Sequence, residues 1–119
     1  MTVSDRPEMI RLFSDVVFWG ERIIDHLNGV TEDEFASDRL RCDAVCWCIA
    51  CIGEAAGKIV QRWPDLGPLH AELELSNAYA MRNRISHGYF SIDFGIVSKA
   101  ATESVPALVI AARKEIDAV

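Results

Sequence analysis

The chain has 119 residues, half of them apolar and a quarter charged, which is typical of one globular domain over residues 1–119 and excludes a disordered chain. Its 12 basic and 18 acidic side chains give a net charge of −6, which excludes a protein that coats nucleic acid with a wholly basic surface. Apolar runs are short and the first residues lack a signal-peptide pattern, so we expect a cytoplasmic protein without a membrane-spanning helix.

Helical periodicity begins near the start of the chain, and no strand-like alternation is sustained anywhere. Apolar residues three and four apart predict an amphipathic helix over about Asp5 to Leu27, which Asn28-Gly29 ends. The expected buried stripe is Ile10, Phe13, Val17, Gly20, Ile24 and Leu27. Thr31 and Glu34 have the spacing of a capping box and predict a short helical turn.

A long helix is predicted from the N-cap residue Asp38 to Trp63. Its expected buried stripe is Val45, Cys48, Ile49, Ile52, Ala55, Ala56, Ile59 and Trp63. Gly53 and Gly57 lie four residues apart on this helix, and they either let another backbone come close or are merely tolerated.

All four cysteines lie in the same predicted helix, at Cys42, Cys46, Cys48 and Cys51. At about 100° per residue, Cys42 and Cys46 share one face, whereas Cys48 and Cys51 share another. One helix cannot wrap four such thiolates around one ion, and no second set of ligands is present in the sequence. We therefore predict no metal site and interpret the cysteines as small apolar core residues.

The second half of the chain opens with a break at Pro64 and an irregular stretch over residues 64–75. A short helix is predicted over about Asn77 to Ile85. His87 and Gly88 mark its end, where Gly88 can adopt a left-handed conformation.

Asp93 is the predicted N-cap of a last helix, in which Pro106 causes a kink. The buried stripe of this helix is expected to be Phe94, Val97, Ala101, Val105, Leu108, Ala112 and Ile116. The elements together predict an all-α, up-and-down bundle of four or five helices.

The segment that carries chemistry is Met81-Arg82-Asn83-Arg84-Ile85-Ser86-His87-Gly88-Tyr89-Phe90. The guanidinium of Arg82 can bind a phosphate, and an imidazole such as that of His87 can move protons near neutral pH. Metal-free RNA cleavage needs such groups, because the ribose 2′-hydroxyl must lose a proton as it attacks the adjacent phosphate.

The spacing of Arg82 and His87 is a difficulty, because five residues correspond to about 140° around a helix. The two side chains can meet if the helix ends between them, or if a two-fold dimer brings two copies of the segment together. The alternative is a plain helix end with a solvated arginine and a capping histidine.

Several stretches of the sequence resemble one known family, the HEPN superfamily, and within it the HepT-like toxins. The stretches are residues 33–39, 43–45, 52–56 and 81–90 with Ile92-Asp93, and the resemblance extends from about Arg11 to Ile116. It implies a HEPN-like bundle that pairs as a homodimer. It also implies a metal-independent endoribonuclease without a cofactor, in a type VII-like toxin–antitoxin pair.

The resemblance also assigns roles to the residues of the motif. It places the catalytic pair on Arg82 and His87, with the polar residue Asn83 in support. The resemblance implies that a partner nucleotidyltransferase, the antitoxin, adds AMP to Tyr89. The chain departs from its relatives at Gly88, where an acidic residue is common, and over residues 67–75. HEPN domains also occur as non-catalytic binding modules that present substrate to a nucleotidyltransferase, which is the alternative function.

Glu54 lies in the middle of the long apolar helix, where it either braces Arg82 or Arg84 from the facing helix or serves the fold alone. Arg84 adds positive potential for RNA or is a solvated surface charge. One side of the long helix is partly basic. It either attracts RNA or is simply a solvated face, and it is formed by Arg39, Arg41, Lys58 and Arg62. Three tryptophans either stack on bases or belong to the core or a dimer interface: Trp19, Trp47 and Trp63.

Overall fold

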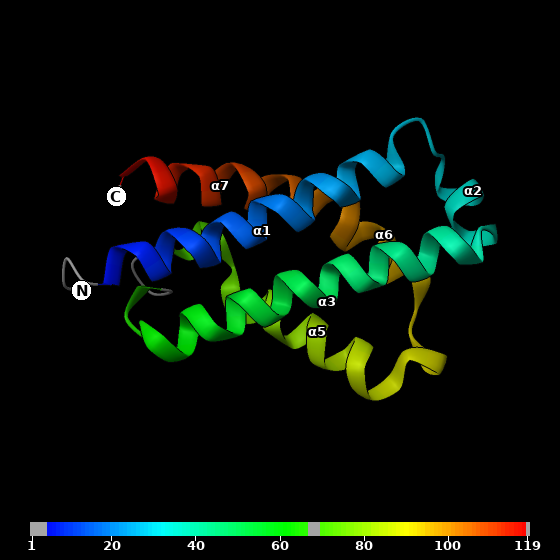
Figure 1. The fold of residues 1–119 in the computed structure, drawn as a ribbon. Coiled ribbons are helices and arrows are strands. Elements are labelled where there is room, and N and C mark those ends of the chain that lie inside the picture. Colours follow the sequence, from blue (N-terminus) through cyan, green and yellow to red (C-terminus); the bar gives the residue numbers. More distant parts are fainter. Residues whose placement is uncertain (1–4, 67–69, 119) are drawn as a thin grey trace.

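The computed structural model describes residues 5–66 and 70–118, and these residues form an all-α bundle without β-strands (Figure 1). The long helices are α1 (Arg6–Leu27), α3 (Arg39–Arg62), α5 (Leu75–Gly88) and α7 (Val105–Ala118). They alternate in direction, which confirms the up-and-down arrangement (Figure 1). The short helices α2 (Glu32–Ser37) and α6 (Phe94–Lys99) lie together at one end of the bundle (Figure 1).

The helices lie side by side in the order α7, α1, α3 and α5, because α3 packs against both α1 and α5 while α1 packs against α7 (Figure 1). Most of the buried core comes from α1, α3 and α7, and Leu75 comes from α5. The first three of these helices contribute, among others, Phe13, Val16, Ile23, Val45, Ile59 and Ala112. Helix α5 packs mainly against α3 and forms one edge of the bundle. The segment with Arg82 and His87 therefore lies on an edge helix with much of its surface uncovered.

The predicted helix boundaries in the first half of the chain are confirmed. Helix α1 ends at Leu27, and Gly29 follows with a φ of 74°, a left-handed conformation that glycine adopts without strain. Thr31 and Glu34 form a reciprocal capping box with two hydrogen bonds of 3.1 Å. The side chain of Asp38 accepts a hydrogen bond from the backbone of Arg41 and caps α3.

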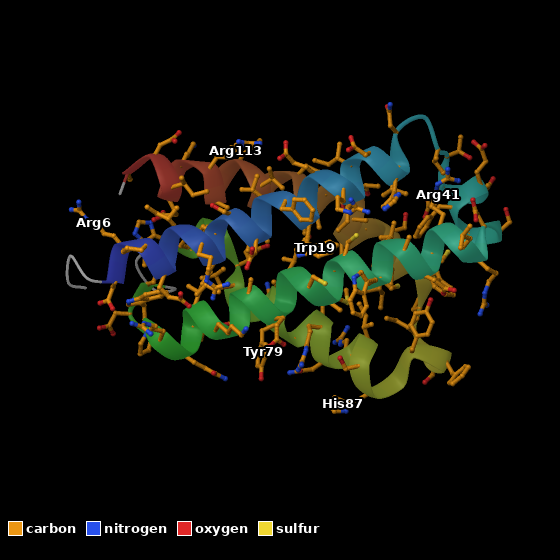
Figure 2. All side chains as sticks on the ribbon, viewed as in Figure 1. Arg6, Trp19, Arg41, Tyr79, His87 and Arg113 are labelled. Carbon is orange, nitrogen blue, oxygen red and sulfur yellow. The ribbon has the colours of Figure 1, made fainter. Side chains whose placement is uncertain are left out.

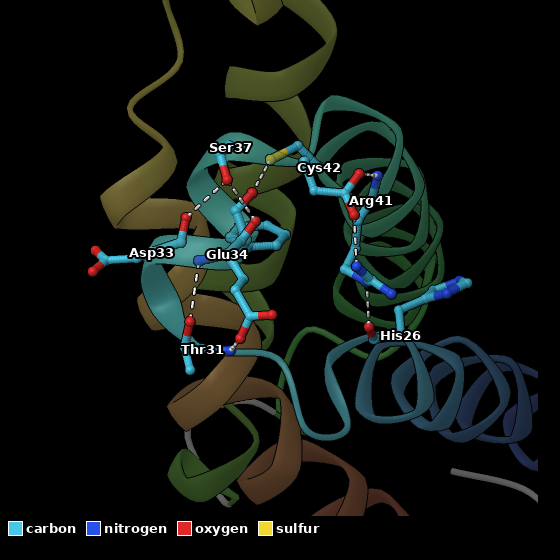
Figure 3. A network of polar contacts seen from close by, with 9 residues as sticks. His26, Thr31, Asp33, Glu34, Ser37, Arg41 and Cys42 are labelled. Atoms are coloured by element: carbon cyan, nitrogen blue, oxygen red, sulfur yellow. Dashed lines mark hydrogen bonds and ion pairs between the residues drawn. The ribbon is translucent and has the colours of Figure 1, made fainter.

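A local network ties α2 and the end of α1 to the start of α3 (Figure 3). Arg41 Nε donates to the backbone carbonyl of His26 over 2.8 Å, and the thiol of Cys42 donates to the carbonyl of Phe35 over 3.0 Å. These bonds satisfy carbonyl groups at the ends of α1 and α2. The entry of α3 is thereby held in place relative to both preceding helices.

The buried face of α1 differs in part from the predicted stripe. Ile10 and Ile24 are exposed, by 36% and 41%, whereas Met9, Leu12 and Ile23 are buried. The prediction for these two isoleucines was wrong because α1 packs between α3 and α7, and those neighbours select the buried arc. By contrast, every residue of the stripe predicted for α3 is buried.

Helix α5 is longer than the predicted Asn77 to Ile85. It begins at Leu75 and includes His87 and Gly88. Gly88 has a φ of −156°, so the expected left-handed conformation is wrong: the chain leaves α5 at Gly88 and enters a 3₁₀ turn, Tyr89–Ser91. Residues 67–69, part of the predicted irregular stretch, lie outside the described residues.

The last helical stretch is continuous but not uniformly α-helical. Asp93 caps α6 through a hydrogen bond from the Gly95 backbone, as predicted. A π-helical segment, Ala100–Ser104, joins α6 to α7, and the Val105 N–H bonds to the Ala100 carbonyl five residues earlier. The segment ends two residues before Pro106, where the sequence predicted a kink. Proline disturbs the α-helical hydrogen bonds of the preceding turn.

The stretch from Phe94 to Ala118 is long and apolar enough to cross a membrane by length and composition, and 39% of its most apolar window is buried within the bundle. A core helix passes the same test. Val97, Val105 and Leu108 from this stretch are part of the buried core. The finding is therefore weak evidence for a membrane span.

Candidate functional site

The close contact between α3 and α5 is centred on two glycines. A Cβ atom at Gly53 would overlap the Cβ of Arg82 and lie 2.7 Å from the Ala78 carbonyl oxygen, and one at Gly57 would lie 2.5 Å from the ring of Tyr79. The absence of side chains at these positions thus lets α5 approach α3. This confirms the first of the two interpretations of the glycine pair, and it places Arg82 directly over α3.

Arg82 is held by polar partners on both helices. Its Nη2 atom lies 3.0 Å from Oε2 of Glu54 on α3, and its Nη1 atom donates to Oδ1 of Asn83 over 3.0 Å. Lys58 lies 3.9 Å from the other oxygen of Glu54. Of the alternatives for Glu54, the structure supports bracing of Arg82. The Arg82 side chain is 32% exposed, so it is oriented but still accessible to a ligand.

His87 lies near the end of α5, is exposed and points away from the bundle (Figure 2). Because α5 continues to Gly88, Arg82 and His87 belong to one uninterrupted helix and remain about 140° apart around its axis. The prediction that the helix ends between them was wrong. The structure therefore does not bring Arg82 and His87 together within one chain.

His87 lines an open groove between the end of α5, the 3₁₀ turn and the start of α6. Arg84 shares this groove, as do Ser91 and Asp93. Ile96 of α6 contributes an apolar part of the wall. Arg84 and His87 are three residues apart, which places them on neighbouring positions of one helix face.

Tyr89 lies on the other side of the chain, against α3. Its hydroxyl donates a hydrogen bond to Oδ1 of Asp43, and its ring packs edge-on against Phe94 with centroids 6.4 Å apart. Burial raises the pKa of Tyr89 above its ordinary value, and the hydrogen bond to Asp43 raises it further. Asp43 is a site residue that sequence reasoning missed, because it lies 46 residues from Tyr89 in the chain.

We expect Asp43→Asn to lower the pKa of Tyr89, because a neutral amide no longer opposes the phenolate. The ionisation can be followed by the near-UV absorbance of tyrosinate in a Tyr79→Phe background, since the chain has only two tyrosines. In the parent protein the folded state keeps the Tyr89 proton to a higher pH than the unfolded chain does. Its free energy of unfolding should therefore fall as the pH rises above about 10, and less so in Asp43→Asn. An unchanged titration in Asp43→Asn would contradict the contact.

Most of the cysteines are buried in the core. Cys42, Cys46 and Cys48 are buried in the core, and burial raises the pKa of Cys46 to about 11. Within residues 5–66 and 70–118, no cluster of His, Cys, Asp and Glu is arranged to hold a metal ion.

Three of the four basic residues predicted to line α3 are in ion pairs: Arg41, Lys58 and Arg62. Trp63 is buried and Trp19 partly buried, whereas Trp47 is 64% exposed.

The protein is an all-α bundle, and its edge helix α5 carries most of an Arg-Asn-x-x-x-His-x-Tyr segment, which ends at Tyr89. The chain belongs to the ribonuclease HepT-like family, whose sequence model matches residues 20–115.

The individual relatives share between a quarter and a third of their residues with this chain over the matched region. "Putative RNase MJ0125" of Methanocaldococcus jannaschii is 26% identical over 92 residues, which is 77% of each chain. "Probable ribonuclease HepT" of Thermococcus cleftensis is 28% identical over 88 residues, which is 74% of this chain and 77% of the relative. No solved structure matches the chain significantly.

Proposed function

We propose that this protein is a metal-independent endoribonuclease and the toxin of a toxin–antitoxin pair. The observation that carries the proposal is the family match over residues 20–115, a span that contains both Arg82 and His87 on the edge helix α5. Both side chains are accessible to a ligand. The names of the relatives support the same substrate class, RNA.

In the proposed reaction the ribose 2′-oxygen attacks the adjacent phosphorus. An O–P bond forms, the bond from phosphorus to the 5′-oxygen breaks, and the products are a 2′,3′-cyclic phosphate and a 5′-hydroxyl. His87 takes the proton from the 2′-hydroxyl or gives one to the leaving oxygen, since imidazole does either near neutral pH. Arg82 stabilises the charge that develops on the phosphoryl oxygens, with Glu54 and Asn83 as its positioning residues.

The complete site, we propose, forms between two copies of the chain related by a two-fold axis. Within one chain Arg82 and His87 face different directions, whereas a second α5 can supply the missing partner. Exposed apolar side chains accompany Glu54 on α3 at seven-residue spacing: Leu40 is 82% exposed and Trp47 is 64% exposed. Apolar surface of this kind is typical of a contact region between proteins.

The test is cleavage of a mixed RNA pool by partner-free protein in the presence of EDTA. We expect cleavage, with 2′,3′-cyclic phosphate and 5′-hydroxyl ends on the products. Absence of cleavage by folded, dimeric protein with an unmodified Tyr89 would instead favour the non-catalytic binding module. That alternative has one structural observation in its favour, namely that Arg82 is already engaged by Glu54 and Asn83.

The antitoxin in this proposal is a nucleotidyltransferase that adds AMP to Tyr89. The phenol oxygen attacks the α-phosphorus of ATP, pyrophosphate leaves, and the phenol proton passes to a base, for which Asp43 is the adjacent acceptor. The modified oxygen can no longer donate to Asp43, and its phosphodiester is negatively charged. We infer that the Tyr89 side chain then leaves Asp43.

The observed position of Tyr89 does not place an AMP phosphate beside Arg82 of the same chain. The partners of Tyr89 and Arg82 on α3, Asp43 and Glu54, are 11 residues apart, which is about 16 Å along a helix. The observed position of the hydroxyl is thus far from Arg82 of the same chain. Silencing by AMP would require either the movement of Tyr89 or a contact with the other copy.

Incubation with ATP and the proposed partner nucleotidyltransferase is expected to add the mass of one AMP group. Tyr89→Phe should stay unmodified, whereas Tyr79→Phe should be modified like the parent protein. The modified protein, freed of the transferase, should have lost its EDTA-resistant cleavage. Modification of Tyr89→Phe to the same extent would show that another residue accepts the AMP.

A further inference from the structure

The groove beside His87 contains a cation without a protein partner. Within residues 5–66 and 70–118, Arg84 takes part in no ion pair, hydrogen bond or ring contact, whereas Arg82 is bound to Glu54 and Asn83. Arg84 is exposed and lines the groove together with His87. A guanidinium that is always charged and has all its donors free is suited to bind a phosphate.

The geometry points to a phosphate-binding face formed by Arg84 and His87 of the same chain. We propose that Arg84 binds a backbone phosphate of the RNA in this groove and so brings the strand to His87. The assignment rests on the proposed function, and it makes Arg84 a substrate-binding residue distinct from Arg82, which acts on the reacting phosphate.

The other groups of the groove are consistent with a single phosphate contact on the α5 side. Ser91 offers a hydroxyl, and Ile96 offers an apolar surface against which a sugar can lie. Asp93 is the acidic group in the groove, and its Oδ1 atom accepts the Gly95 backbone N–H over 2.7 Å. Its negative charge opposes an anion near the start of α6, so the phosphate should lie on the side of Arg84.

This proposal explains how an acidic protein can bind RNA. The net charge of −6 disfavours binding by the surface as a whole, and most arginines of the described chain are engaged by protein groups, for example Arg41 and Arg113. Binding must then depend on few contacts, and the free guanidinium beside His87 is one of them. Loss of one phosphate contact to a single strand lowers the slope of log affinity against log salt by about 0.7.

The test measures binding of a fluorescent mixed-sequence oligonucleotide with 2′-O-methyl riboses, which cannot be cleaved, at several salt concentrations. We expect Arg84→Gln to weaken binding about fivefold to tenfold and to reduce the salt slope by about 0.7, as one lost contact predicts. Arg84→Lys should restore part of the affinity. Arg113→Gln is the matched control, because it removes the same charge from the opposite side of the molecule (Figure 2).

Two results would overturn the proposal: unchanged binding by Arg84→Gln, or an equal loss of binding in Arg113→Gln, which would indicate an effect of net charge alone. Failure of the proposed function gives a different set of results. If the parent protein binds the oligonucleotide through Arg84 but cleaves no RNA, the phosphate-binding face stands and the ribonuclease assignment falls. If the parent protein cleaves RNA and Arg84→Gln has an unchanged KM and an unchanged kcat, only the role of Arg84 is refuted.

Discussion

RNA cleavage by the His87→Ala variant is expected to fall by about a hundredfold to ten-thousandfold, which is the usual contribution of a general acid or base. The variant should keep its helical content and its thermal midpoint, because His87 is exposed at the end of an edge helix. Initial rates on a labelled RNA in EDTA, with circular dichroism of the same samples, measure both effects.

His26→Ala is the matched control for this experiment. His26 lies in the last turn of α1, and its contact to Arg41 uses the backbone carbonyl, which the substitution preserves. The control should cleave RNA like the parent protein. Equal cleavage by His87→Ala and His26→Ala would remove His87 from the mechanism.

Gly53→Ala is expected to destabilise the protein, although alanine favours a helix by about 1 kcal/mol over glycine. The added methyl group would overlap Arg82 Cβ and lie 2.7 Å from the Ala78 carbonyl oxygen, so α5 would have to move away from α3. Overpacking of this kind costs about 1–3 kcal/mol. We therefore expect a lower free energy of unfolding in urea and, because Arg82 is displaced from Glu54, slower RNA cleavage.

Gly88→Ala provides the comparison for stability. A Cβ atom there meets only Oγ of Ser91 at 3.6 Å, and the φ of −156° lies outside the left-handed region that favours glycine. Its free energy of unfolding should stay close to that of the parent protein. If Gly53→Ala were as stable as Gly88→Ala, α3 and α5 could not be in the close contact that positions Arg82.

Features of the fold that depend on local chemistry could be predicted from the sequence. The Thr31–Glu34 capping box and the caps at Asp38 and Asp93 involve residues two or three apart, so short sequence patterns specify them. The helix α3 is buried along most of its length, which makes its apolar stripe unambiguous. On α1 the stripe was ambiguous, and packing against two neighbours left Ile10 and Ile24 exposed.

The sequence identified Arg82, His87 and Tyr89 as candidate site residues, but it identified neither their arrangement nor the contact of Tyr89 with Asp43. Sequence spacing identified the angular conflict between Arg82 and His87, yet it could not show that α5 continues through both. The contact between Tyr89 and Asp43 joins residues 46 positions apart, and only tertiary packing creates it. Likewise, the difference between the engaged Arg82 and the free Arg84 depends on what the facing helix presents.

The π-helical segment Ala100–Ser104 has a consequence for the groove at the far end of α6. A π-helical turn, closed by a hydrogen bond between residues five apart, holds one more residue than an α-helical turn. This segment therefore sets the rotation of α6 about its axis relative to α7. Removal of one residue there would rotate α6 by about 100° while α7 kept its place in the core. Asp93 and Ile96 would turn away from His87. A change in chain length, without any substitution in the groove, would thus reshape the groove beside His87.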